Sequence, residues 1–290
     1  MQRVTIIGLG LMGGSIGLWL KKKRPSIPIV GYSRKKDTRD DAVGLKAIDN
    51  AANSIEEAVR YADLIIIATP IDQIVQTVKK IIPFTQPDSV ITDIGSVKGS
   101  IVDALRDIPN FIGGHPMTGK ETRGLPNASA DIFEHCTWVL TPTPKTLGNK
   151  LKTLQSFLKQ LDVNTVIMNA SLHDAVVAEI SHVPALIATI LMQSATDAGN
   201  WERAEKLAAM GFRDTTRLAG SDPELTTAFC MHNRKNVLGS LERFDKQLKI
   251  LKKLIEEGDT QKLKSYFSNI QKQRTAWFAK SRFGKTRLDK

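Results

Sequence analysis

The chain has 290 residues, a formal net charge of +11 and 41% hydrophobic residues, so it can form two ordinary domains and bury a sizeable core. This positive charge would suit nucleic acid, a membrane surface or anionic small molecules, but no motif of a nucleic-acid-binding module is present. Two distant cysteines form no disulfide framework and the five histidines lack metal-ligand spacing, so we expect a cytoplasmic protein without a metal site.

We expect neither a secretion signal nor a membrane-spanning segment. The chain enters a strand pattern at Arg3, and no apolar run reaches membrane-spanning length. The basic stretch Ala279–Lys290 is expected to be a solvated end.

Short apolar runs alternate with helical patterns in the first half of the chain. Uninterrupted apolar strands between helices are typical of a parallel sheet that is covered on both faces, so residues 1–168 are predicted to form a doubly wound α/β domain. The predicted strands are Arg3–Ile7, Ile27–Val30, Leu64–Ala68, Val90–Asp93, Phe111–Gly113, Trp138–Leu140 and Thr165–Met168.

A glycine motif follows the first predicted strand and opens a predicted helix, Leu11–Lys23. In a strand–turn–helix context, G-x-G-x-x-G binds the pyrophosphate of a dinucleotide at the helix N-terminus. We therefore interpret residues 1–168 as a Rossmann-type domain, with a glycine turn that binds no ligand as the alternative. The motif residues are Gly8, Leu9, Gly10, Leu11, Met12 and Gly13.

The end of the second predicted strand, IPIVGYSRKK, bears on the choice of cofactor. In NAD enzymes an acidic residue about 20 positions past the glycine motif binds the ribose 2′-hydroxyl. That position falls at Ser33, which can donate a hydrogen bond to a phosphate oxygen, and Arg34 and Lys35 add positive charge. The sequence favours NADP over NAD, although a solvated turn in an enzyme that takes either cofactor is the alternative.

Three further strand ends carry polar residues. In an open parallel sheet, ligands lie beyond the carboxyl ends of the strands. Ala68, Thr69 and Pro70 are therefore expected to line the nicotinamide side of the crevice, and Ser96 follows the next strand. His115 lies among glycines in GGHPM, where an imidazole can accept a proton near neutral pH.

From Ser171 onward the strand signal disappears, so residues 169–290 are predicted to form an all-helical domain. Ser171 is the expected N-cap of a first helix that reaches Met192, and Pro184 should kink or break it.

The rest of this domain is predicted to contain a polar loop, GFRDTTRLAGSDPE, and two long helices. The helices are expected at Pro223–Glu256 and Thr260–Phe278, and their wide apolar faces favour a homodimer.

Four more side chains are candidates for binding or support. Arg213 and Arg217 lie four residues apart, which suits a clamp for a carboxylate or, alternatively, a salt-bridged pair through Asp214 or Asp222. His182 lies within the first long helix and is either a structural residue or part of a pocket. Lys98 is interpreted as a cation at a helix start or near phosphate.

The motifs GLGLMGGS, ATP, TDIGSVK, GGHPMTGKE, LTP, HDAVVAEISHVP and GFRDTTRLAGSDPE occur in this order. Together they resemble the prephenate/arogenate dehydrogenases of tyrosine biosynthesis, and the likeness extends from about residue 3 to residue 255.

The resemblance implies an oxidative decarboxylation and a role for each matched residue. Hydride leaves the hydroxyl-bearing carbon of a cyclohexadienol, carbon dioxide departs and the ring becomes aromatic. His115 then accepts the hydroxyl proton, Ser96 hydrogen-bonds near it, and His182 supports the substrate pocket. Arg217 holds a substrate carboxylate, and His173, from the His-Asp pair of the family, is expected to bind the substrate. The helical domain forms the dimer.

One position distinguishes two substrates within the family. Some prephenate-preferring members have a second histidine three residues after the Ser-His-x-Pro histidine, and this chain has Ala185 there. The difference resembles the arogenate-using, cyanobacterial-type members, so arogenate is expected and prephenate is the alternative. Two other functions are a β-hydroxyacid dehydrogenase, which would need a lysine that the helix from Ser171 to Met192 lacks, and a non-catalytic dinucleotide sensor.

Overall fold

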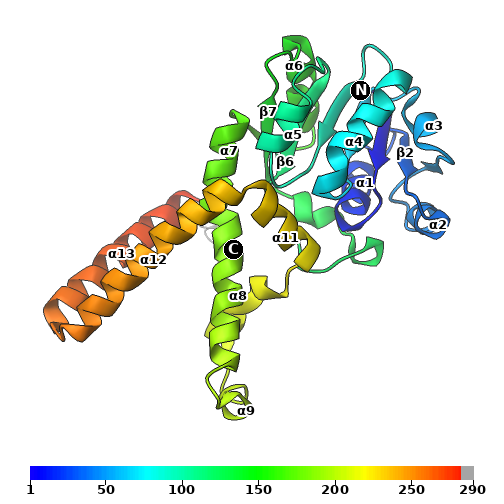
Figure 1. The fold of residues 1–290 in the computed structure, drawn as a ribbon. Helices are drawn as coiled ribbons and strands as arrows, with labels where there is room; N and C mark the ends of the chain where they lie inside the picture. Colours follow the sequence, from blue (N-terminus) through cyan, green and yellow to red (C-terminus); the bar gives the residue numbers. More distant parts are fainter. Residues whose placement is uncertain (282–290) are drawn as a thin grey trace. The chain divides into compact units, whose positions relative to one another are not determined.

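The computed structural model describes residues 1–281, so most of the predicted basic end, Ala279–Lys290, lies outside the described residues. Two compact units are present, one from Met1 to Val237 and one that begins at Leu238 (Figure 1). The predicted domain border between residues 168 and 169 lies inside the first unit, where helices follow directly on the sheet.

The described residues of the first unit contain an eight-stranded sheet with the order β3-β2-β1-β4-β5-β6-β7-β8. Its central strands are parallel, as predicted, because both of their faces are covered and every residue is buried in β1 and in β4. The strands are β1 (Val4–Ile7), β2 (Ile29–Tyr32), β3 (Asn50–Ala51), β4 (Leu64–Ile67), β5 (Val90–Asp93), β6 (Phe111–Pro116), β7 (Thr137–Pro142) and β8 (Asn164–Ile167).

Strand β7 departs from the predicted parallel sheet. It runs antiparallel to β6, with His115 opposite Val139. A parallel strand needs a crossover connection, usually a helix, whereas the segment between β6 and β7 holds only two 3₁₀ turns, Leu125–Asn127 and Ala130–Phe133. The sheet is therefore mostly, but not wholly, parallel.

Helices cover both faces of the sheet. Ile16 and Trp19 of α1 and Phe157 of α6 pack in one apolar cluster, and Ala58 of α3, Ile74 of α4 and residues of α5 pack in the other. These helices are α1 (Leu11–Lys23), α2 (Lys36–Gly44), α3 (Ile55–Val59), α4 (Ile71–Ile81), α5 (Gly99–Ala104) and α6 (Gly148–Lys159).

The predicted first long helix is interrupted. It begins at the N-cap Asn169, not at Ser171, and consists of α7 (Ala170–Val177), a π-helical turn (Ala178–His182) and α8 (Val183–Thr196). Pro184 lies in the first turn of α8, where its missing N–H costs least. The break therefore comes just before the proline.

Contrary to expectation, the stretch Ala170–Thr196 is long and apolar enough for a membrane span, since a window of 18 residues within it has a mean hydropathy of 1.8. Of that window, 33% is buried within the protein. The stretch carries Asp174, whose carboxylate hydrogen-bonds the start of α5, so this stretch packs against the α/β part of the first unit.

The segment predicted as a polar loop is mostly helical. It contains α10 (Met210–Thr216) and a 3₁₀ turn (Arg217–Gly220), and α9 (Trp201–Ala204) precedes it. The predicted helix Pro223–Glu256 is two helices, α11 (Pro223–His232) and α12 (Arg234–Glu256), which meet at Asn233. The break is explained by the buried side chain of Asn233, which hydrogen-bonds Asp174 and His182.

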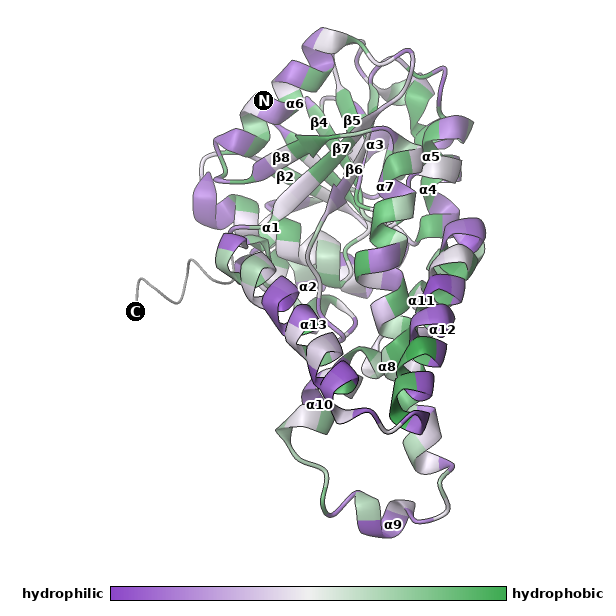
Figure 2. Cartoon of the chain, turned by 90° about the vertical axis from the view of Figure 1, so that its left-hand side faces the viewer, coloured by the Kyte–Doolittle hydropathy of each residue, from purple (hydrophilic) through white to green (hydrophobic). Residues whose placement is uncertain are grey.

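The second unit contains α12 from Leu238 onward and the whole of α13 (Thr260–Lys280). Asp259 caps α13 by accepting hydrogen bonds from the main chain of Gln261 and Lys262. Apolar and polar residues alternate along both helices (Figure 2). Large apolar side chains remain exposed on the unit, among them Leu248, Ile255, Phe267, Ile270 and Trp277.

Candidate active site

The glycine motif forms a tight turn between β1 and α1. Gly8 has a φ of +99°, and a Cβ there would lie 2.5 Å from the main-chain oxygen of Ala68. A Cβ on Gly13 would lie 1.8 Å from the oxygen of Gly8, so neither position accepts a side chain. A Cβ on Gly10 would meet nothing within 4 Å, and no side chain caps α1. This open backbone at a helix N-terminus fits a pyrophosphate group.

The predicted cations Arg34 and Lys35 lie in the turn after β2. A third cation, Arg39, was not predicted and lies beside them. Arg34 and Lys35 are exposed and Ser33 is half-buried. The Arg39 guanidinium donates hydrogen bonds to the main-chain oxygens of Ser33, at 2.7 Å, and of Arg34. It also lies 6.0 Å from the centroid of the Tyr32 ring. Arg39 therefore holds the turn that displays Ser33 and Arg34.

Three buried polar atoms of the predicted site have no hydrogen-bond partner among the described residues. They are Thr69 Oγ1, after β4, Ser96 Oγ, after β5, and His182 Nε2. Buried polar atoms are nearly always hydrogen-bonded, so these three fit a site where the polar groups of a cofactor and a substrate complete them.

His115 belongs to a chain of three hydrogen-bonded side chains. Its Nδ1 lies 2.8 Å from Nε2 of His173, and Nδ1 of His173 lies 2.8 Å from Oδ1 of Asp174. The His173 side chain is fully buried, and the two imidazole planes cross at 70°. Burial lowers the pKa of His115 well below its usual value, and His173, Lys98 and His182 lower it further. His115 is therefore a neutral imidazole at neutral pH.

Behind His115 lies a buried ion pair. Lys98 and Asp93 are both fully buried and bonded to each other, and Lys98 Nζ also donates to the Gly114 main-chain oxygen at 2.8 Å. Asp93 accepts from the Gly114 and Gly95 amides. Burial lowers the pKa of the Lys98 ammonium, and the neighbouring Asp93 carboxylate acts in the opposite direction by raising it. Lys98 lies at the start of α5, as one of the two sequence interpretations predicted, but its side chain is buried in the core, where it fixes the strand carrying His115, and is not a cation near phosphate.

His182 is buried against the end of α11. Its ring stacks on Phe229 with 4.2 Å between centroids, and its Nδ1 lies 3.3 Å from Nδ2 of Asn233. The same Asn233 amide donates to the main-chain oxygen of Asp174 at 2.8 Å. Burial lowers the pKa of His182 to about 4, although Asp174 and the Ser96 main chain raise it. Asn233, which the sequence analysis missed, joins α7, the π-helical turn and α11.

The two candidate arginines differ in their surroundings. Arg217 forms an ion pair with Glu121, and the neighbouring Arg123 forms one with Asp222, so the loop after β6 is tied to the segment after α10. Arg213 is exposed and bonded to Asp214 at 2.9 Å, as the salt-bridge alternative anticipated. Arg217 pairs with neither acid proposed for that alternative.

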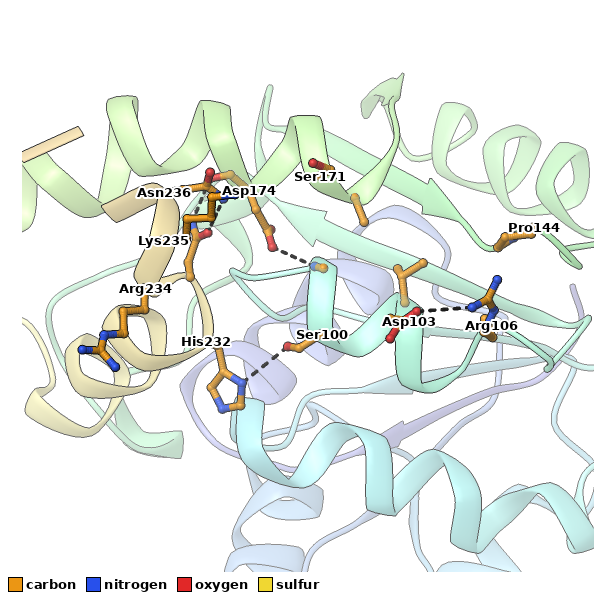
Figure 3. Close-up of a pocket in the computed structure, with 14 residues that line it drawn as sticks. Ser100, Asp103, Arg106, Pro144, Ser171, Asp174, His232, Arg234, Lys235 and Asn236 are labelled. Carbon is orange, nitrogen blue, oxygen red and sulfur yellow. Dashed lines mark hydrogen bonds and ion pairs between the residues drawn. The ribbon is translucent and has the colours of Figure 1, made fainter. Parts of the chain in front are cut away.

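The structure thus brings His115, His173 and His182 together around Asp174 and the ends of β5 and β6. Among residues 1–281, no group of three or more His, Cys, Asp or Glu side chains is arranged to hold a metal ion. A pocket of about 390 Å³ lies on the other side of Asp174, and its lining includes Ser100, His232 and Lys235 (Figure 3). The glycine motif and His115 do not line this pocket.

Comparison with known proteins matches both halves of the chain to one family. Residues 16–167 match the family model "Prephenate dehydrogenase, nucleotide-binding domain", and residues 169–269 match "Prephenate dehydrogenase, dimerization domain". Prephenate dehydrogenase of Bacillus subtilis is 32% identical over 274 residues, which are 92% of this chain and 74% of that protein.

Solved structures give the same likeness. Synechocystis arogenate dehydrogenase is 32% identical with a TM-score of 0.80, and the match covers 95% of this chain and 99% of that one. Prephenate dehydrogenase of Aquifex aeolicus, in complex with hydroxyphenyl propionate and NAD⁺, is 31% identical with a TM-score of 0.88 and covers 95% and 98%.

Proposed function

Because the chain belongs to the prephenate dehydrogenase family, we propose that it oxidatively decarboxylates arogenate to tyrosine with NADP as hydride acceptor. The observation that carries the chemistry is the neutral, buried imidazole of His115 at the carboxyl end of β6. Prephenate, which would give 4-hydroxyphenylpyruvate, is the second candidate substrate, and the names of the curated relatives favour it.

In this proposal His115 accepts the proton of the ring hydroxyl, and Ser96 hydrogen-bonds beside it. His182 supports the pocket, and Arg217, with Arg213 as a second cation, receives substrate carboxylate. The resemblance assigns these roles except that of Arg213, which rests on its spacing from Arg217, and the unpaired buried Ser96 Oγ and His182 Nε2 are consistent with the roles of those residues. The choice of arogenate rests on Ala185, which is a buried residue of α8 in the place of a second histidine.

The residues proposed to hold the cofactor follow the strand ends. The glycine motif from Gly8 to Gly13 would take the pyrophosphate, Ala68–Pro70 the nicotinamide side, and Ser33, Arg34 and Lys35 the adenosine end. When bound, the nicotinamide supplies the hydride acceptor for the oxidation. The three hydrogen-bond donors or cations after β2, and the lack of an acidic residue at that position, support NADP.

We further propose a cytoplasmic homodimer that assembles through residues 169–290. The match to a dimerization-domain model and the exposed apolar side chains of α12 and α13 support the assembly. The lack of a disulfide between Cys136 and Cys230 is consistent with a reducing compartment.

The test is an assay with arogenate and prephenate, each with NADP and NAD, followed by the absorbance of the reduced nicotinamide. We expect the highest kcat/KM for arogenate with NADP. A higher value for prephenate would reassign the substrate. No turnover of either compound would favour a β-hydroxyacid dehydrogenase or a dinucleotide sensor.

A further inference from the structure

The hydrogen bonds around His173 determine which nitrogen of His115 carries its proton. An ionised carboxylate only accepts hydrogen bonds, so Asp174 Oδ1, 2.8 Å from Nδ1 of His173, requires a proton on that nitrogen. A neutral imidazole has one N–H, so Nε2 of His173 is an acceptor. The atom 2.8 Å from it, Nδ1 of His115, must then donate. His115 is left with its lone pair on Nε2.

The far end of this chain is fixed by the main chain. The Lys98 amide donates to Asp174 Oδ1 and the Gly99 amide donates to Oδ2, both at 2.7 Å. Asp174 is 4% exposed and His173 0% exposed, so water does not compete for these atoms. Figure 3 shows the Asp174 carboxylate directed at the start of α5. Hydrogen bonds from two main-chain amides hold the carboxylate in place.

We propose that His173 and Asp174 are positioning residues, which hold His115 as the Nδ1–H tautomer with Nε2 free to accept the substrate proton. The proposal rests on the role of His115 as base. In the step, the O–H bond of the substrate breaks and an N–H bond forms at Nε2 of His115. The resulting imidazolium keeps its Nδ1–H bond to His173, which in turn donates to the anionic Asp174. The Asp174 charge therefore stabilises the imidazolium through His173.

This role differs from the substrate contact that the family match suggested for His173. Both nitrogens of its ring are engaged within the protein, by His115 and by Asp174. No nitrogen of His173 is left for a substrate group.

Replacing His173 with glutamine or with asparagine tests the hydrogen bonds of its two ring nitrogens one at a time. In His173→Gln the side-chain oxygen can take the place of Nε2 and accept from His115, while the link to Asp174 is lost. In His173→Asn the amide can take the place of Nδ1 and donate to Asp174, while His115 loses its partner. We expect kcat to fall about 100-fold in His173→Asn and about 10-fold in His173→Gln, with substrate KM within about threefold of the parent in both.

His135→Asn is the matched control for these variants. His135 is exposed and has a φ of +56°, a conformation that asparagine tolerates well. We expect its kcat to equal that of the parent. Equal losses in His173→Asn and His173→Gln, or a loss that is only in KM, would overturn the positioning role.

A second measurement needs no variant of His173. The chain has five histidines, so the ring nitrogens can be assigned by ¹⁵N NMR of the intact protein with single His→Asn variants. We expect protonated Nδ1 and unprotonated Nε2 in both His115 and His173 at neutral pH. A proton on Nε2 of His115, or an imidazolium at His173, would overturn the proposal. The expected tautomers combined with full turnover in His115→Asn would instead refute the base assignment in the proposed function.

Discussion

At the scale of single residues, the surroundings of His115 suit its proposed role as a base at neutral pH. Burial lowers its pKa well below the usual 6.5, and the neighbouring His173, Lys98 and His182 lower it further. We therefore expect kcat/KM to be independent of pH above about 6.5 and to fall only below that value, as His115 takes up a proton in the free enzyme. A pH profile with the assay substrate measures this. An ascending limb above neutrality would contradict the assignment.

Replacing the base tests the same residue directly. In His115→Asn we expect kcat to fall by a factor of about 10²–10⁴, because proton transfer loses its acceptor. The dissociation constant for NADP, measured by fluorescence titration, should stay near that of the parent. A variant that keeps kcat within about threefold would show that another group accepts the proton.

His182 makes stability depend on pH. Its pKa is about 4 in the folded protein and 6.5 for a histidine in the unfolded chain, so the unfolded chain binds a proton first as the pH falls. The stability that comes from keeping His182 neutral is fully present above pH 6.5 and is lost progressively toward pH 4. Between pH 7 and pH 5 the free energy of unfolding should fall by about 2 kcal/mol from this group.

Urea unfolding of the parent and of His182→Asn at both pH values isolates this effect. Asparagine can still accept the hydrogen bond from Asn233, and it does not titrate. The variant should be less stable at pH 7 because the stacking on Phe229 is lost, but its stability should depend less on pH. Equal pH dependence in the two proteins would mean that His182 is not held neutral.

Arg217 is expected to act on substrate binding. Arg217→Ala should raise the substrate KM by about 10- to 150-fold, since a charge-assisted contact is worth roughly 1.5–3 kcal/mol. The NADP KM should change little. Arg203→Ala, which removes an exposed arginine on α9, is the control. An unchanged substrate KM in Arg217→Ala would leave the arginine only its ion pair with Glu121.

At the scale of elements, the sequence predicted the sheet and the positions of its strand ends. Apolar runs such as that of β4 identify buried parallel strands, and the glycine motif and His115 lie where these strands end. The antiparallel β7 was not predictable, because a strand pattern carries no direction.

The helices after residue 169 were predicted less well, because tertiary contacts determine where these helices begin and end. Asn233 ends α11 since its amide bonds Asp174 and His182, and no local signal shows this. Lys98 lies at a helix start, as predicted, but its complete burial was not predictable, because it depends on the ion pair with Asp93. The sequence contains both His115 and the His-Asp pair at the head of α7, but no local pattern shows that His115 and His173 are hydrogen-bonded.

The turn between β2 and α2 is expected to select the cofactor. The parent should prefer NADP by at least tenfold in kcat/KM, or about 1.4 kcal/mol. Replacing Ser33 with Asp and Arg34 with Ser should reverse the order, because the new acid repels a 2′-phosphate and binds a 2′-hydroxyl.

The control for this pair of substitutions is Lys152→Asp, an exposed change on α6 that alters the net charge equally, by two units. It should leave the preference intact. Equal use of both cofactors by the parent would mean that the turn does not recognise the 2′-phosphate. An unchanged cofactor preference in the double variant would lead to the same conclusion.

At the scale of the whole molecule, the exposed apolar side chains of α12 and α13 are expected to be buried by a second copy. Sedimentation at micromolar concentration should give twice the chain mass of 32.0 kDa. Phe267→Asp, which places a charge on an exposed apolar position of α13, should weaken the assembly. An active monomer at that concentration would refute the dimer.

The buried pair of Lys98 and Asp93 also limits how this sequence can drift over generations. Losing either member alone leaves an uncompensated buried charge, which typically costs about 3–5 kcal/mol, a large share of the stability of a domain. A lineage can therefore exchange the pair only by changing both positions nearly together. Lys98 also donates hydrogen bonds to the strand of His115 and, through its main-chain amide, to Asp174, so such an exchange would have to rebuild the proposed catalytic centre at the same time.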